Sequence, residues 1–174
     1  MSPALITSAC LALFAALTLI AALKDLVSYT IPNWISLALV AAFAPAAVSA
    51  ELRLLDIGVC VLIGLIMLMV AITMFALRWL GGGDAKLLAA VAPWLGLSGL
   101  PAFLMFTALA GGALALLLLA LRSAWVRPFA VGGPGWIDRL AQPGGATPYG
   151  VAIAIGALAA LPHSILVGAA GLLP

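Results

Sequence analysis

Two aspartates occupy the positions in this sequence that are best placed for chemistry, each where an apolar segment meets a turn. Asp25 is followed by largely apolar residues that could extend the preceding helix until Pro32 stops it. Asp84 comes directly after three glycines and directly before another apolar run. Because glycine has no side chain, the run gives the backbone freedom and lets a neighbouring segment approach closely. We therefore expect two carboxylates that can be held together near the ends of two helices.

Two carboxylates held at one place can hydrolyse a peptide bond. They cannot both ionise easily, so they share one proton. One of them then acts as a base on a water molecule, and the other donates a proton to the carbonyl group that is attacked. The pair predicts an aspartic peptidase with Asp25 and Asp84 as its catalytic residues.

The other polar residues favour no competing chemistry. The glycines before Asp84 are not a phosphate-binding loop, since neither GxxxxGK[ST] nor GxGxxG is present. His163, the only histidine, lies in the last apolar run and is interpreted as packed or interfacial. The two cysteines show no CxxC spacing, so no metal site and no cofactor are predicted. The remaining acidic residues are interpreted as helix ends close to arginines: Glu51, Asp56 and Asp138.

The composition requires a lipid environment. Of 174 residues, 67% are hydrophobic and 7% are charged, whereas about 25% of a soluble domain is charged. So few charges cannot cover a water-exposed surface, and membrane lipid is the expected surrounding. A net charge of +2 without a basic patch argues against a nucleic-acid partner. No hydrophilic block is long enough for a second domain, so one membrane-embedded domain is predicted over residues 1–174.

Charges and turn residues divide the chain into six apolar segments. A helix needs about 20 residues to cross the bilayer core. The first segment lacks a basic region before it and is interpreted as a retained membrane helix, not a signal peptide. Small residues such as Ala108 and Gly112 are expected at close helix contacts. The prediction is an all-α polytopic membrane protein with about six transmembrane helices, the fourth being the shortest: 3–23, 34–50, 57–77, 87–97, 101–121 and 149–174.

The basic residues predict an orientation, because Lys and Arg are retained on the cytoplasmic side of a membrane. With both termini outside, Arg53 is the one basic residue outside, and six lie inside: Lys24, Arg78, Lys86, Arg122, Arg127 and Arg139. The reverse orientation would place these six outside. The predicted topology is therefore N-out and C-out, with Asp25 and Asp84 on the same, cytoplasmic side.

Three motifs resemble those of the type IV prepilin peptidases, and they occur in the same order. Asp25, six further residues and then a Pro-Asn pair resemble the first catalytic motif of that family. The run GGGDAKLLAA at 81–90 resembles the second, the GxGD motif with its KLLAA-like continuation. The run TPYG at 147–150 is similar to the proline–aromatic–glycine turn that opens the last helix. The motif residues that would support the two aspartates are Pro32, Asn33, Gly81, Gly83, Lys86, Pro148 and Gly150.

The resemblance covers essentially the whole chain and implies a specific hydrolysis. Enzymes of this family remove the short basic leader of prepilins or pseudopilins, cutting after a glycine at the cytoplasmic face. The cut frees a hydrophobic helix for assembly into a pilus or pseudopilus. The resemblance implies Asp25 and Asp84 as the dyad, prepilins or pseudopilins as protein partners, no cofactor, and the bacterial inner membrane as the location.

One departure from the family narrows the prediction. Many members carry a cytoplasmic domain between the first two helices, often with paired CxxC motifs, and it is linked to N-methylation of the new N-terminus. Here only residues 25–33 separate those helices, and no CxxC exists. The chain therefore resembles the minimal, peptidase-only form of tight-adherence (Flp-type) pilus systems, without methyltransferase activity.

Several alternatives stay open at this point. Lys86 either acts on Asp84 or a nearby loop, or anchors the topology, and Asn33 either caps the second helix or bonds near the site. Gly81 and Gly83 are expected to serve the backbone rather than to contact substrate. Archaeal preflagellin peptidases share the dyad and the type of substrate. Two other classes of function compete with a peptidase: a small proton- or cation-coupled transporter subunit, and a non-catalytic subunit of a secretion apparatus.

Overall fold

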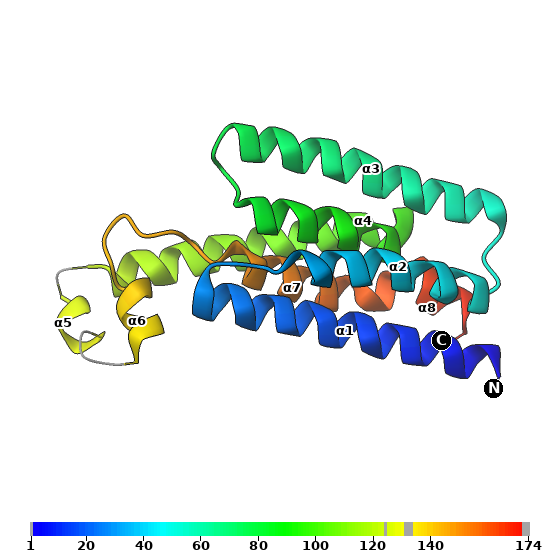
Figure 1. Ribbon diagram of the computed structural model, residues 1–174, viewed down its shortest axis with the longest axis horizontal. Helices are drawn as coiled ribbons and strands as arrows, with labels where there is room; N and C mark the ends of the chain where they lie inside the picture. Colours follow the sequence, from blue (N-terminus) through cyan, green and yellow to red (C-terminus); the bar gives the residue numbers. More distant parts are fainter. Residues whose placement is uncertain (1, 124, 131–133, 172–174) are drawn as a thin grey trace.

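The computed structural model describes residues 2–123, 125–130 and 134–171, and the rest of the predicted domain lies outside these ranges. The described residues are helical, with no strand among them, which confirms the predicted all-α polytopic fold. Four stretches are long and apolar enough to cross a membrane, and one further apolar helix is shorter. The orientation in the membrane stays a prediction. The main helices lie along the long axis of the molecule (Figure 1): α1 (Pro3–Ser28), α2 (Asn33–Ser49), α3 (Leu54–Ala76), α4 (Gly82–Leu121) and α7 (Tyr149–Ala160).

The long helix α4 is broken in two at Gly96. This residue has φ 63° and ψ −168°, far from helical values. The sequence predicted the break at 98–100, between two apolar segments, but those residues are helical. The half before the break, residues 82–95, is about 21 Å long at 1.5 Å per residue, which is shorter than the bilayer core of about 30 Å. The fourth helix is therefore short, as expected, although it begins earlier than the predicted residue 87.

The chain reverses its direction at this break. Residues 82–95 run antiparallel to α3, because Gly82 lies against Phe75 and Pro93 lies against Gly64. Residues 97–121 then return along α7 (Figure 1), so that both ends of α4 point to the same end of the bundle.

Close helix contacts along this return segment involve different residues from those expected. Gly111 faces Tyr149 of α7, and Thr107 faces Gly156, each across a distance too short for an added Cβ. The predicted pair is exposed instead: Ala108 lies on the surface, and nothing lies within 4 Å of a Cβ built at Gly112. The small-residue interface exists, but the prediction placed it one residue too far along the helix.

Replacing Gly96 with alanine is expected to destabilise the protein by about 1–3 kcal/mol, because its backbone conformation is one that only glycine adopts readily. The added Cβ would also lie 2.8 Å from Cγ2 of Ile165. The measurement is thermal unfolding of purified protein in detergent. Gly58→Ala is the matched control, since a Cβ there meets nothing within 4 Å. Equal unfolding temperatures for the two variants would contradict the prediction.

The core of the bundle is centred on Trp94, which is fully buried in the first half of α4. Its Nε1 donates a hydrogen bond to the Leu39 carbonyl oxygen of α2 at 3.1 Å. Its ring lies 4.9 Å from that of Phe14 on α1 and 6.0 Å from that of Phe43 on α2. A single side chain thus holds α1, α2 and α4 together and fixes the two helices that carry the motif aspartates.

The last apolar segment is interrupted. After α7 come a 3₁₀ turn (Leu161–His163) and α8 (Ile165–Ala169), and Ser164 caps α8 by accepting a hydrogen bond from the Leu166 N–H. Pro162 lacks an N–H and so ends the regular helix. His163 is exposed in this turn, which favours the interfacial interpretation over the packed one.

Candidate active site

Asp25 lies in the last turn of α1, with its side chain almost fully buried. The helix continues for three residues beyond it, as the apolar residues after Asp25 predicted. Its Oδ2 accepts a hydrogen bond from the backbone N–H of Gly150 at 2.7 Å. Its own carbonyl oxygen accepts from the N–H of Tyr29, which closes α1 in a left-handed conformation with φ 53°. The carboxylate at the end of α1 is therefore held by the backbone of a residue 125 positions away in the sequence.

Asp84 is the third residue of α4, whose N-cap is Gly81. At this position a side chain can reach back to the free N–H of the N-cap residue. The Asp84 carboxylate lies close to this terminus: its Oδ2 is 2.8 Å from a Cβ built on Gly81, and the backbone N–H groups of Gly81 and Gly150 are within its electrostatic reach. Its Oδ1 is buried and has no hydrogen-bond partner among the described residues. One oxygen thus lies at the helix terminus beside Gly81, and the other is left for a further partner.

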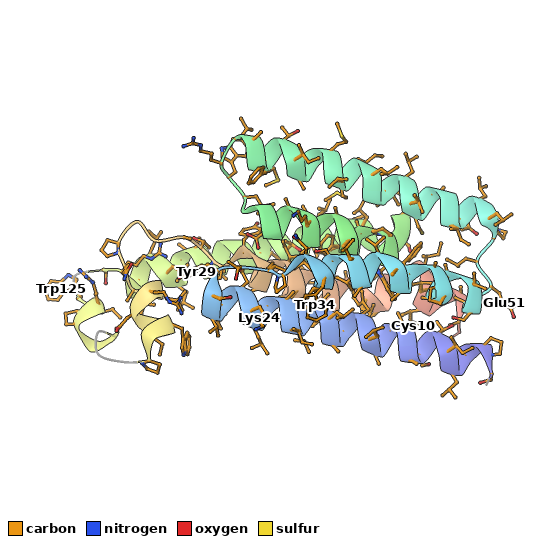
Figure 2. The ribbon with its side chains drawn as sticks, in the orientation of Figure 1. Cys10, Lys24, Tyr29, Trp34, Glu51 and Trp125 are labelled. Carbon is orange, nitrogen blue, oxygen red and sulfur yellow. The ribbon has the colours of Figure 1, made fainter. Side chains whose placement is uncertain are left out.

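The structure brings the two aspartates together. Both line one cavity of about 190 Å³, together with Tyr29 and the 81–83 glycine run. Both also line a larger adjoining cavity of about 670 Å³, which extends to Trp79 and to Tyr149. They are near enough for their charges to interact, and the N–H of Gly150 interacts with both carboxylates. In Figure 2 this end of the bundle carries the labels Lys24 and Tyr29, and the opposite end carries Cys10 and Glu51.

The motif glycines allow this close packing. A Cβ on Gly83 would lie 3.1 Å from Cβ of Ile31, and a Cβ on Gly150 would lie 2.8 Å from Cδ1 of the same residue. Gly81 has φ −69°, and no residue of the 81–83 run has a positive φ. The predicted close approach is therefore observed, whereas the predicted backbone freedom is not used.

Lys86 and Asn33 link the two aspartate motifs. Asn33 was expected as a possible N-cap of the second helix, but Pro32 is the N-cap and Asn33 is the first helical residue, with no side-chain capping bond. Its Oδ1 instead accepts a hydrogen bond from Lys86 Nζ at 2.8 Å. Lys86 therefore joins the N-terminal part of α4 to the first residue of α2. Pro148, from the third motif, is the N-cap of α7 and precedes the helix that presents Gly150.

Two arginines that the sequence did not assign to the site bind backbone carbonyl groups of segments near it. Arg122 donates to the carbonyl oxygens of Leu140 and Ala146, and Arg139 donates to that of Val27 at the end of α1. The Arg122 bonds tie α6 (Gly135–Leu140) and the segment after it to the end of α4, and the Arg139 bond ties α6 to the end of α1. The sequence carried only a weak signal, because both arginines were sufficiently explained as cytoplasmic anchors.

Tyr29 is the other residue that the sequence did not reveal. Its hydroxyl oxygen is buried, it lies within electrostatic reach of Arg122, and its side chain lines both cavities with the two aspartates. Burial raises the pKa of this phenol above its usual range. The hydroxyl therefore keeps its proton at neutral pH and can serve as a hydrogen-bond donor. The one available signal was an aromatic polar residue inside the segment between Asp25 and Pro32.

Among the residues that the structure describes, no group of three or more His, Cys, Asp or Glu side chains is placed to hold a metal ion. What the site offers is two buried carboxylates, the buried hydroxyl of a half-buried tyrosine, and backbone N–H groups around a small cavity. Such an arrangement can hold a water molecule between two carboxylates and a polar group of a ligand beside it.

The family model for the type IV leader peptidases matches residues 12–116, which is more than half of the chain and includes both aspartates. The chain belongs to the type IV leader peptidase family. Neither a curated protein nor a solved structure matches it. The family indicates that the protein is a peptidase, and its four membrane-length apolar stretches indicate a membrane protein. The matched part of this leader peptidase ends before Gly150, which therefore contributes to the site from outside it.

Proposed function

We propose that this leader peptidase is an aspartic endopeptidase in which Asp25 and Asp84 form the catalytic dyad. The observation that carries the proposal is their position in one small cavity, on helices from two different motifs. Both side chains are buried, at 4% and 7% exposure, so neither serves merely as a helix end in water. Neither forms an ion pair with a described residue, and burial of two unpaired charges would be costly, which favours a shared proton.

The dyad would hydrolyse a peptide bond in two steps. The ionised aspartate takes a proton from water, and the water oxygen attacks the peptide carbonyl carbon while the protonated aspartate donates to the carbonyl oxygen. The tetrahedral intermediate then collapses: its C–N bond breaks, and the nitrogen receives a proton from the dyad. At the same time a hydroxyl of the intermediate gives its proton to the other aspartate, so one water is consumed, a carboxylic acid and an amine are formed, and the dyad again holds a single proton.

The proposed substrate is a prepilin or pseudopilin, whose basic leader is cut off after a glycine at the cytoplasmic face of a bacterial inner membrane. The family and the positive-inside distribution of Lys and Arg support this proposal. The connection between α1 and α2 is residues 29–32 alone, which leaves no room there for a methyltransferase domain. We therefore propose cleavage without methylation.

The proposal is tested by co-expressing the full chain with a prepilin and following the leader by gel shift. Loss of the leader, with the new N-terminus read by mass spectrometry directly after a glycine, is the expected result. A prepilin that keeps its leader while the peptidase is present in the membrane would count against the proposal. Accumulation of transported ions without cleavage would favour the transporter alternative.

Replacing Tyr29 with phenylalanine is expected to lower kcat about tenfold or more, because it removes a donor that could stabilise charge on the carbonyl oxygen. KM is expected to change less, since the ring remains in place. Tyr149→Phe is the matched comparison: it removes the only other phenolic hydroxyl of the chain, which lies against Gly111 and belongs to a residue that lines the larger cavity but not the small one. Purified enzyme and a prepilin substrate give both constants. A Tyr29→Phe enzyme with the wild-type kcat would remove Tyr29 from the proposed mechanism.

A further inference from the structure

A groove runs between α2 and α3, with the first half of α4 as its floor. α3 packs on α4, and α2 packs on α1 and α4, so the two walls stand on a common base. In Figure 1, α4 lies between α2 and α3 at this place. The groove has a volume of about 710 Å³. It shares no lining residue with the larger cavity at the aspartates and meets the small one at Asn33.

The walls of the groove are apolar, and its floor is made of small residues. Leu37 and Val40 of α2 face it from one side, and Val61 and Leu65 of α3 face it from the other. All four side chains are exposed, so within the described part of the chain they remain largely uncovered. The floor residues of α4 that line it are Ala89, Ala90 and Pro93. Small residues on the floor leave room for another helix to approach closely.

The groove is continuous with the candidate active site. Asn33 lines both the groove and the small cavity of the two aspartates, and Lys86, its hydrogen-bond partner, also lines the groove. From Asn33 the groove follows α2 to Val48, a helical length of about 23 Å at 1.5 Å per residue. The hydrocarbon core of a bilayer is about 30 Å thick, so a groove of this length covers most of its depth.

A buried polar group lies near the active-site end of the groove. Ser36 is only 8% exposed and lines the groove, and its Oγ has no hydrogen-bond partner among the described residues. It lies one helical turn from Asn33. The first four N–H groups of any helix have no partner within that helix, so a helix that begins at this end would offer donors to Ser36. The acyl chain of a lipid has no such donor.

We propose that this groove seats the apolar helix of the substrate, with the beginning of that helix beside Asn33 and Ser36. The inference rests on the proposed function, because it places the segment that follows the scissile bond. A peptide chain that leaves the aspartates along Asn33 enters the groove directly. The apolar walls then bury the part of the substrate that a bilayer would otherwise surround.

Two matched tryptophan variants test the groove, with the full chain in lipid nanodiscs. Ala44 lines the groove and is exposed, so Ala44→Trp fills it. Ala41 is also exposed on α2 but does not line the groove, and Ala41→Trp is the control. One substrate is a prepilin that contains its leader and apolar helix. The other is a soluble peptide with the leader and cleavage-site residues but no apolar helix.

Ala44→Trp is expected to raise KM for the helix-bearing substrate at least about tenfold and to leave cleavage of the soluble peptide within about twofold of wild type. Ala41→Trp is expected to change neither. Normal cleavage of the helix-bearing substrate by Ala44→Trp, or equal slowing of both substrates, would overturn the groove and leave the peptidase proposal standing. A wild-type enzyme that cleaves neither substrate would overturn both.

Photo-crosslinking gives an independent measurement. A photoreactive amino acid at Leu65, inside the groove, is expected to form an adduct with the apolar helix of the prepilin when introduced into the Asp84→Asn enzyme. Ile66 is exposed on α3 without lining the groove, and the same group there is expected to give none. Adducts at Leu65 with lipid alone would assign the groove to lipid and overturn the proposal.

Discussion

Asp25→Asn and Asp84→Asn are each expected to lower the rate of prepilin cleavage by about 10²–10⁴-fold, the range in which acid–base catalysis contributes. Asparagine keeps the size of the side chain but can neither take a proton from water nor return one to the leaving nitrogen. Each substitution therefore breaks the proton exchange of the dyad without emptying the cavity. Gel shift of co-expressed prepilin detects the loss, and purified enzyme in nanodiscs measures its extent.

The matched control for these variants is Asp56→Asn. Asp56 is the partner of Arg53 in an exposed ion pair at the start of α3, and the two atoms Arg53 Nε and Asp56 Oδ2 lie 2.8 Å apart. Such pairs contribute little to stability, so cleavage is expected to stay at the wild-type level. The amount of protein in the membrane must be equal for all three variants. Normal processing by either the Asp25 or the Asp84 variant would show that the dyad assignment is wrong.

Gly150→Ala is expected to lower cleavage about 100-fold, because misplacement of a reacting group by about 1 Å has an effect of this size. A Cβ at this position would lie 2.9 Å from Oδ2 of Asp25 and 2.8 Å from Cδ1 of Ile31. The carboxylate must then move, and with it the hydrogen bond from the Gly150 N–H. Steady-state kinetics with a prepilin substrate should show the loss mainly in kcat.

Gly112→Ala is the control for this substitution. Gly112 is an exposed helical glycine with nothing within 4 Å of a built Cβ, and alanine stabilises such a position by about 0.5–1 kcal/mol. Its activity is expected to be unchanged. The same activity in Gly150→Ala as in Gly112→Ala would mean that Asp25 does not depend on the position of α7.

The sequence predicts the fold well wherever long apolar runs end at charges or turns. The start of α3 differs from its prediction by three residues, since Asp56 was taken as a boundary but lies in the first turn of the helix. The position of the chain reversal at Gly96 could not be predicted from the sequence. It is a single residue in an unusual backbone conformation inside a continuous apolar helix, and Pro93 and Pro101 nearby both lie within the helix as well. The register of the interface at Gly111 likewise depends on packing against α7.

For the candidate site, the motifs identified the two aspartates, and the structure adds their surroundings. Gly150 was recognised as a motif residue, but its hydrogen bond to Asp25 joins residues 125 apart in sequence, and no local pattern reveals it. Asn33 was wrongly expected as a cap, because a Pro-Asn pair before an apolar run is typical of a helix start. Its bond to Lys86 arises only when α2 and α4 lie side by side.

The hydrogen bond from Gly150 has a consequence for the minimal length of an active enzyme. The family match ends at residue 116, whereas this bond comes from the helix that starts at Tyr149. A polypeptide shortened to the matched residues would keep both aspartates and lose the group that orients one of them. The shortest polypeptide expected to be active therefore extends at least through α7. A fragment that ends earlier is expected to be active only when α7 is supplied as a second polypeptide.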